Sequence, residues 1–139
     1  MLRGVNPESV RRATESDLPK IVALNRVIQQ LHHDSRPDWF KPVDPAGFLS
    51  IARRWLHSSD AAVFVAEDDD EVIGYAAAVR SERPDHPLVY AATYVELDQL
   101  VVAPAHRGHG VGSALCEQVI AWSECEGMER IEVATWGPP

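Results

Sequence analysis

The stretch that decides the fold reads Leu100-Val101-Val102-Ala103-Pro104-Ala105-His106-Arg107-Gly108-His109-Gly110-Val111-Gly112-Ser113-Ala114-Leu115. Its apolar first residues predict a buried strand, which Pro104 ends. The three glycines that follow predict a tight turn into a helix. A helix start carries unpaired backbone N–H groups and the positive end of the helix dipole, and glycines let a bulky anion approach the main chain. The stretch therefore indicates a turn that binds a pyrophosphate group.

Two other nucleotide-binding motifs fit this turn poorly. Glycines at 108, 110 and 112 lack the spacing of the dinucleotide-binding fingerprint, and the turn lies late in the chain. A P-loop is excluded because no Gly-Lys-Ser/Thr follows. On the glycines alone, a purely structural strand-to-helix turn remains an equal alternative.

The segments on either side of the turn extend this pattern. After it, residues 111–126 predict a helix with apolar residues at helical spacing, and residues 129–136 predict a closing strand. Before it, residues 88–102 predict one long strand.

The first half of the chain contains two helices between strands. Residues 9–14 predict a short strand, residues 18–33 an amphipathic helix whose apolar stripe includes Asn25, and residues 44–56 a second helix. A β-hairpin follows over residues 61–79, turning at three consecutive aspartates. The order is β-α-α-β-β-β-α-β, which indicates an α/β fold around a mixed sheet. Since no repeat or long linker divides the chain, we expect a single domain over residues 1–139.

Composition excludes several classes of protein. The chain has 139 residues, 45% hydrophobic and 24% charged, typical of one globular domain. A net charge of −8, with no basic block longer than an arginine pair, argues against nucleic-acid binding. No apolar run approaches 18 residues, so we expect no membrane span. The two cysteines point to opposite sides of one predicted helix, and with no secretory signal we expect a reducing, cytoplasmic setting.

The strand and glycine turn of residues 100–115 resemble a motif of a known family. Arg107-x-x-Gly110-x-Gly112 after Leu100-x-Val102-x-Pro104 is similar to the acyl-CoA-binding motif of the GNAT superfamily of N-acetyltransferases. The resemblance extends to Arg12-Ala13-Thr14-x-x-Asp17-Leu18 and to Val72-Ile73-Gly74-Tyr75, and so covers nearly the whole chain.

The resemblance implies a GNAT-like fold, acetyl-CoA as cosubstrate and a primary amine as acceptor. Main-chain groups of the strand would pair with the pantetheine amides, and the N–H of its first residue or a neighbour would polarise the thioester carbonyl; these residues are Leu100, Val101 and Val102. The pyrophosphate would lie against the backbone amides of Arg107, Gly108, His109, Gly110, Val111, Gly112 and Ser113. His106 and His109 would flank the phosphates; with no Cys or carboxylate ligand nearby, we expect no metal.

The resemblance also implies direct attack by the amine, without an acyl-enzyme, so the amine must first lose a proton. A carboxylate on the strand is the usual acceptor, and Glu96 and Asp98 are the candidates. Strand geometry predicts that residues 96, 98, 100 and 102 share one face, where two carboxylates would raise each other's pKa. We expect Glu96 to be the base ahead of Asp98, because histone-type members have their base at a similar position. Each could instead be an exposed or salt-bridged strand residue.

Two regions near the candidate site leave alternatives open. The family resemblance places His32 and His33, with Trp39 and Phe40, beside the acceptor site, but dipole complementation and packing explain them as well and are our expectation. After the strand that ends at Trp136, the family usually continues with a helix and two strands, and that helix supplies a tyrosine acid. The sequence therefore leaves three readings: a fragment, a chain completed by another chain, or a non-catalytic acyl-CoA-binding or regulatory module.

The closing strand has a further implication. No later strand in this sequence can cover residues 129–136, and an open sheet edge is a template for pairing with another chain. We therefore expect a homodimer through this edge. The alternative is a monomer in which Pro138 and Pro139 block pairing at the edge.

Overall fold

The computed structural model describes residues 9–128 and 130–133. The elements, in chain order, are β1 (Val10–Arg12), η2 (Glu15–Asp17), α1 (Leu18–Ser35), α2 (Pro45–His57), β2 (Ala61–Asp68), β3 (Glu71–Arg83), β4 (Ala92–Val102), η3 (Pro104–His106), α3 (Val111–Cys125) and β5 (Ile131–Val133). The predicted order of strands and helices, an α/β arrangement, is confirmed.

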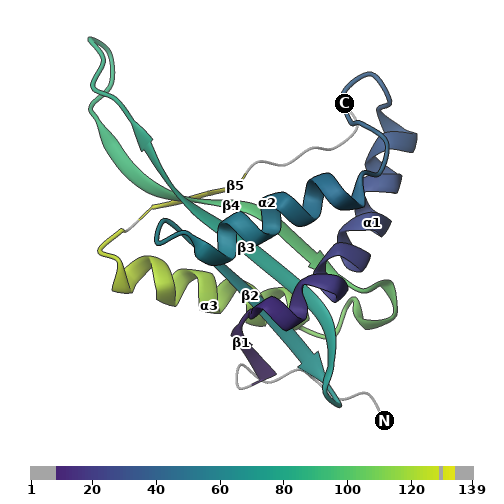
Figure 1. The fold of residues 1–139 in the computed structure, drawn as a ribbon. Helices are drawn as coiled ribbons and strands as arrows, with labels where there is room; N and C mark the ends of the chain where they lie inside the picture. Colours follow the sequence, from purple (N-terminus) through teal and green to yellow (C-terminus); the bar gives the residue numbers. More distant parts are fainter. Residues whose placement is uncertain (1–8, 129, 134–139) are drawn as a thin grey trace.

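The five strands form one mixed sheet in the order β1-β2-β3-β4-β5 (Figure 1). Neighbouring strands run antiparallel from β1 to β4, whereas β5 lies parallel to β4 because α3 connects them as a crossover. The predicted hairpin turns through Asp69 and Asp70, both with positive φ (50° and 64°), a conformation that aspartate tolerates better than most residues.

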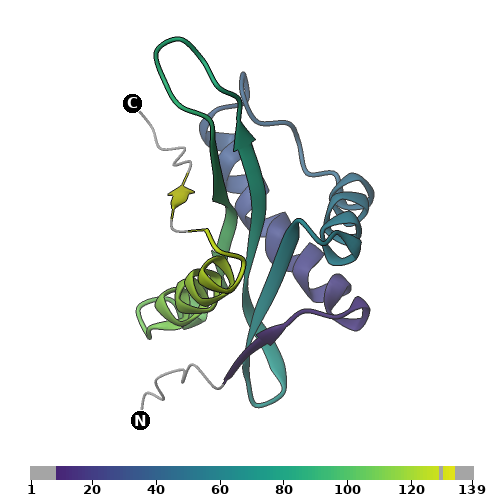
Figure 2. The ribbon, with the colours of Figure 1, turned by 90° about the vertical axis from the view of Figure 1, so that its left-hand side faces the viewer.

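Helices cover both faces of the sheet. Figure 2 shows α3 on one face and α1 with α2 on the other. The α3 layer buries Val10, Ala62, Phe64, Ala66, Ile73, Ala76, Ala78, Val95, Leu97, Val111, Ala114, Leu115, Val119 and Met128. The opposite layer buries Leu18, Ile21, Leu24, Phe48, Ala52, Val63, Val65, Val72, Tyr75, Ala77 and Val101. Strand residues therefore alternate between two cores, as expected for a sheet covered on both sides.

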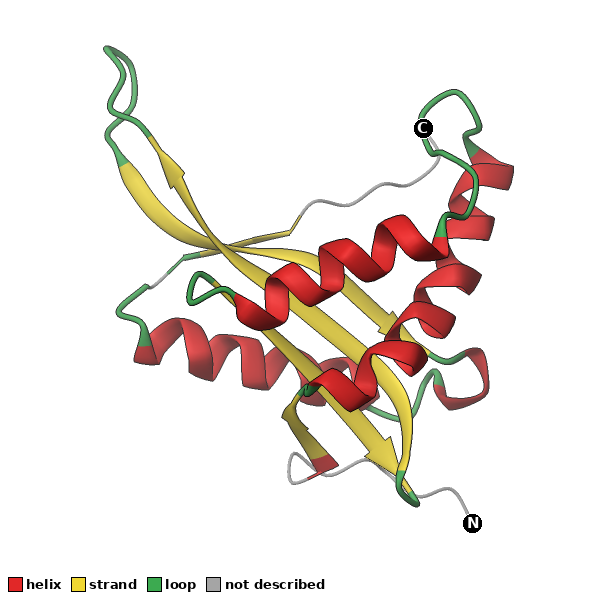
Figure 3. Ribbon diagram, viewed as in Figure 1, coloured by secondary structure: helices red, strands yellow, loops and turns green. Residues whose placement is uncertain are grey.

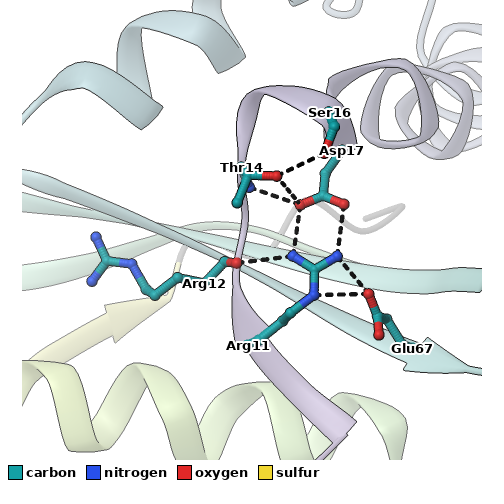
Figure 4. A network of polar contacts seen from close by, with 6 residues as sticks. All are labelled: Arg11, Arg12, Thr14, Ser16, Asp17 and Glu67. Carbon is teal, nitrogen blue, oxygen red and sulfur yellow. Dashed lines mark hydrogen bonds and ion pairs between the residues drawn. The ribbon is translucent and has the colours of Figure 1, made fainter. Parts of the chain in front are cut away.

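A buried carboxylate holds the start of α1 to the sheet (Figure 4). Asp17 accepts hydrogen bonds from both terminal nitrogens of Arg11, at 2.8 and 2.9 Å, and from the backbone N–H of Thr14 at 2.7 Å. Arg11 also donates from Nε to Glu67 of β2 at 2.7 Å. The network joins β1, β2 and the entry to the first helix.

The connection between β3 and β4 differs from the prediction. Strand β3 continues to Arg83, and β4 begins at Ala92 rather than Leu88. Residues 84–91 instead form the loop at the far end of these strands, visible in Figure 3, closed by reciprocal backbone bonds between His86 and Val89. Pro84 and Pro87 lack the N–H that a regular ladder needs, which explains why pairing ends there.

Strand β5 is the last strand of the described sheet and covers residues 131–133. Of the rest of the predicted closing strand, Arg130 is described and lies before β5, whereas residues 129 and 134–136 lie outside the described residues, as do Pro138 and Pro139. No helix in the described ranges has the length and apolar character needed to cross a membrane.

Candidate functional site

The turn before α3 has the backbone of an anion-binding site. Gly108 and Gly110 adopt positive φ, 80° and 84°, and a Cβ added to either would meet nothing within 4 Å, so the space in front of the turn is open. The first α-helical bond runs from the N–H of Ala114 to the carbonyl of Gly110 at 3.0 Å. The N–H groups of residues 111–113 therefore have no partner within the helix, and its first turn contains no acidic residue.

Arg107 and His106 fasten this turn to the sheet. The Nε of Arg107 donates to the carbonyl of Val102 at 3.3 Å, at the end of β4. The Nε2 of His106 lies 3.6 Å from Asp68 at the end of β2, and its buried Nδ1 has no hydrogen-bond partner among the described residues. His109 is half-buried. Among the described residues, no three His, Cys, Asp or Glu side chains are grouped closely enough to hold a metal.

Strands β4 and β5 pair over only part of their length. Their parallel ladder joins residues 95–97 to residues 131–133. Beyond Leu97, strand β4 continues for five residues to Val102, paired with β3 on one side and with no described strand on the other. Main-chain groups of Leu100, Val101 and Val102 are thus available to an extended ligand on that edge.

A β-bulge changes which side chains share a face. Ala77 pairs with Gln99 and Ala78 with Leu97, which leaves Asp98 as an extra residue in β4. Because of this bulge, Glu96, Gln99 and Val101 face the α1–α2 layer together with their β3 partners.

Leu100 and Val102 lie on the opposite, α3 face. Their side chains are the atoms nearest to a Cβ built on Gly112, at 4.0 and 3.9 Å respectively. The prediction that residues 96, 98, 100 and 102 share one face is therefore wrong, since a one-residue bulge inverts the alternation.

A pocket of about 480 Å³ opens where β4 and β5 separate. It is lined by Asn25, Ile28, Gln29 and His32 of α1, Phe40 of the following loop, Leu97, Asp98, Gln99, Leu100 and Val101 of β4, and Val133 of β5. Asp98 is thus in the pocket wall, and Glu96 is not. The pocket lies along this free stretch of β4, from Leu97 to Val101, and the turn follows the end of the strand at Val102.

The two histidines at the end of α1 differ in position: one borders the candidate site and the other has a packing role. His32 lines the pocket, with its ring centroid 4.6 Å from that of Phe40, so both rings border the candidate site. The Nδ1 of His33 lies 2.8 Å from the carbonyl oxygen of Phe40, and Gln29 donates to the carbonyl of Lys41 at 2.8 Å. His33 therefore has the packing role, fixing the loop that carries Phe40.

The two candidate carboxylates have different surroundings. Asp98 keeps access to solvent, yet the protein around it removes enough water to raise its pKa, and the negative charge of Glu96 raises that pKa further. Glu96 is half-buried and accepts a hydrogen bond from the hydroxyl of Ser81 at 3.4 Å. A carboxyl with a raised pKa is better suited to accept a proton near neutral pH.

A polar network joins two residues of the pocket wall, Asn25 and Gln99, to Tyr75 in the core. The hydroxyl of Tyr75 donates to Oε1 of Gln99, and Nδ2 of Asn25 donates to the same oxygen at 3.3 Å. Tyr75 is completely buried, and this burial raises the pKa of its phenol well above the ordinary value of 10.0. The ring packs in the core of the α1–α2 layer.

Sequence reasoning missed Asn25 and Gln99 as pocket residues. A signal existed for each: Asn25 is a polar residue within the apolar stripe of a helix, and Gln99 follows Asp98 where a regular strand would place an apolar side chain. Buried polar side chains need partners, and these two supply them to each other.

The chain was compared with protein families and solved structures. The model of the acetyltransferase (GNAT) family matches residues 28–138. No curated protein matches significantly. An acetyltransferase from Vibrio fischeri shares 25% identity at a TM-score of 0.71, covering 93% of this chain and 97% of that one.

Two further solved structures share the fold. An aminoglycoside 6'-N-acetyltransferase from Acinetobacter haemolyticus is 19% identical at a TM-score of 0.71, covering 91% of this chain and 78% of its own. A predicted acetyltransferase from Clostridium acetobutylicum, solved with acetyl-CoA, is 15% identical at a TM-score of 0.72, covering 91% of this chain and 79% of its own. With the turn, the separating strands and a family match over most of its length, this chain belongs to the GNAT family of acetyltransferases.

Proposed function

We propose that this chain transfers the acetyl group of acetyl-CoA to a primary amine by direct attack in a ternary complex. The observation that carries the proposal is the free edge of β4 beyond Leu97, which joins a pocket containing a carboxylate to a turn with unpaired backbone amides. Such a stretch suits an extended ligand that has phosphates at one end and its reactive group at the other.

The residues of the turn fit the pyrophosphate of CoA. The open space at Gly108 and Gly110 admits a bulky anion, and the free N–H groups of residues 111–113 donate to it. We assign Arg107, Gly108, His109, Gly110, Val111, Gly112 and Ser113 to this role.

The free edge of β4 fits the extended arm of CoA. We assign the main chain of Leu100, Val101 and Val102 to the pantetheine amides, with the N–H of Leu100 or a neighbour donating to the thioester carbonyl. Acetyl-CoA supplies, when bound, an acetyl thioester that is reactive toward amines.

Asp98 is the better candidate for the proton acceptor. It lines the pocket, and its raised pKa favours proton uptake from an ammonium group. Glu96 lies outside the lining and acts through its charge, which strengthens the affinity of Asp98 for a proton. This reverses the order expected from the sequence.

The experiment measures acetyl-CoA binding by calorimetry and CoA thiol release with a panel of amines. The panel includes an aminoglycoside, a polyamine, free lysine, amino-acid amides and a peptide with a free N-terminus. Binding with amine-dependent thiol release supports the transferase. Binding without release for any amine supports the non-catalytic acyl-CoA-binding module, and absence of binding refutes both.

A further inference from the structure

The carboxamide of Gln99 is held in one orientation. Its oxygen accepts from the hydroxyl of Tyr75 and from Nδ2 of Asn25 at 3.3 Å. Tyr75 is fully buried and Asn25 is 6% exposed, so neither donor can turn to water instead. Rotating the amide would set its Nε2 group against Nδ2 of Asn25, and two donors that face each other are unfavourable.

The orientation of this oxygen determines which group of Gln99 remains for a ligand in the pocket. With Oε1 turned toward Tyr75 and Asn25, the Nε2 group lies at the other end of the carboxamide, and Gln99 lines the pocket. No residue in the described ranges accepts a hydrogen bond from Nε2. Asp98, the residue before Gln99, lines the same pocket.

This arrangement selects for a particular chemistry beside the amine. Nε2 is an uncharged donor and pairs with an oxygen. A carboxylate there would meet the negative charges of Asp98 and Glu96, whereas an alkyl polyamine has no oxygen to offer. A neutral carbonyl satisfies both conditions, and Ile28 and Leu97 supply apolar wall for the carbon atoms around it.

We infer that Gln99 donates from Nε2 to a carbonyl oxygen of the acceptor, so that the preferred substrates are amines with a carboxamide or peptide group on the adjacent carbon. The inference rests on the proposed acetyl transfer and names its acceptor class. Tyr75 and Asn25 are positioning residues, since they act by holding the carboxamide.

The test compares two acceptors of nearly equal shape. L-Alaninamide carries the carboxamide, and 3-methylbutan-2-amine replaces it with an isopropyl group. The kcat/KM ratio of the two is measured with acetyl-CoA for the wild type and for Gln99→Glu, in which the outward donor becomes an acceptor while the inner oxygen still receives Tyr75 and Asn25. Because the intrinsic reactivity of each amine is the same with both proteins, it cancels in the comparison.

We expect Gln99→Glu to lower the kcat/KM preference for alaninamide at least about fivefold, which corresponds to one hydrogen bond between uncharged groups. The loss should appear mainly in KM. Tyr75→Phe should lower it in the same direction by releasing the carboxamide. Gln30→Leu is the matched control, because this exposed glutamine of α1 bonds only to Asp34 among the described residues. Melting curves confirm that each variant is folded.

The outcomes separate this inference from the proposed function. An unchanged preference in both Gln99→Glu and Tyr75→Phe overturns the inference and leaves acetyl transfer standing. If the wild type releases no thiol with any amine, acetyl transfer fails, and binding of the two compounds to the CoA complex is measured by NMR titration. Weaker alaninamide binding in Gln99→Glu then supports the role of Gln99, and equal binding overturns it.

Discussion

Asp98 and Glu96 are separated by one residue, yet only Asp98 lines the pocket. We expect Asp98→Asn to lower kcat by roughly 10²-fold or more, as for loss of a positioned general base, with CoA affinity close to wild type. Glu96→Gln should cost less. Steady-state kinetics with calorimetric CoA titration measures both effects, and a larger loss in Glu96→Gln would restore Glu96 as the base.

The same two residues predict a pH effect. The base works only when ionised, so activity falls as pH drops through the pKa of Asp98. Because the charge of Glu96 raises that pKa, Glu96→Gln should lower it and move the acidic limb of the kcat/KM profile to lower pH. A limb that stays in place, or moves to higher pH, contradicts the coupling.

At the scale of elements, the turn into α3 offers a matched pair of glycines. Gly110 has a φ of 84°, which a β-branched side chain rarely adopts, whereas a Cβ at Gly112 makes only ordinary contacts with Val102 and Leu100. Gly110→Val should weaken CoA binding at least about tenfold, because it misaligns N–H groups that bond to a charged ligand. Gly112→Ala should bind nearly as wild type. Calorimetric titration of CoA into the folded variants measures both affinities. Wild-type affinity in Gly110→Val would rule out pyrophosphate binding at this turn.

The entry to α1 predicts an acid-sensitive contribution to stability. The hydrogen bond from Arg11 lowers the pKa of Asp17 below its ordinary value of 3.8, so the ionised form stabilises the fold above that pH and loses its effect as pH falls further. Asp17→Asn should reduce the free energy of unfolding at pH 7 by about 1–3 kcal/mol.

Urea denaturation between pH 7 and pH 3 measures this effect. The difference between wild type and Asp17→Asn should shrink toward the acidic end of the range. Asp38→Asn is the control, because Asp38 forms an exposed ion pair with Arg36 at 3.0 Å and should change stability little. A difference for Asp17→Asn that stays constant with pH would exclude the ionic origin.

Hydrophobic periodicity is sufficient to predict the helices and most of the strands, because their apolar residues recur at the spacing that buries one face. The bulge in β4 was not predicted, although the tandem polar pair Asp98-Gln99 interrupts the alternation set by Val95 and Leu97. The order of the two carboxylates depends on that bulge. Long-range contacts such as Tyr75 with Gln99 depend on which strands pair, and no local pattern encodes that pairing.

For the whole molecule, the described sheet has two edge strands, β1 and β5, and β5 is the edge that we expect to associate. We expect a species of twice the 15.4 kDa chain mass by sedimentation velocity at micromolar concentration. Val133→Lys should shift it toward the monomer, since a charge on an edge strand opposes pairing. Ile120→Lys, on the exposed side of α3, is the control with the same change in charge. A monomer at every concentration argues against the edge contact.

The bulge also makes Asp98 an insertion in an otherwise regular strand. Removing that single residue would leave Leu97 opposite Ala78 and Gln99 opposite Ala77, so every remaining side chain would keep its partner and its face. We expect the chain without Asp98 to melt cooperatively near wild type, bind CoA and transfer almost nothing. The fold would then keep its register without the residue that we propose as the base.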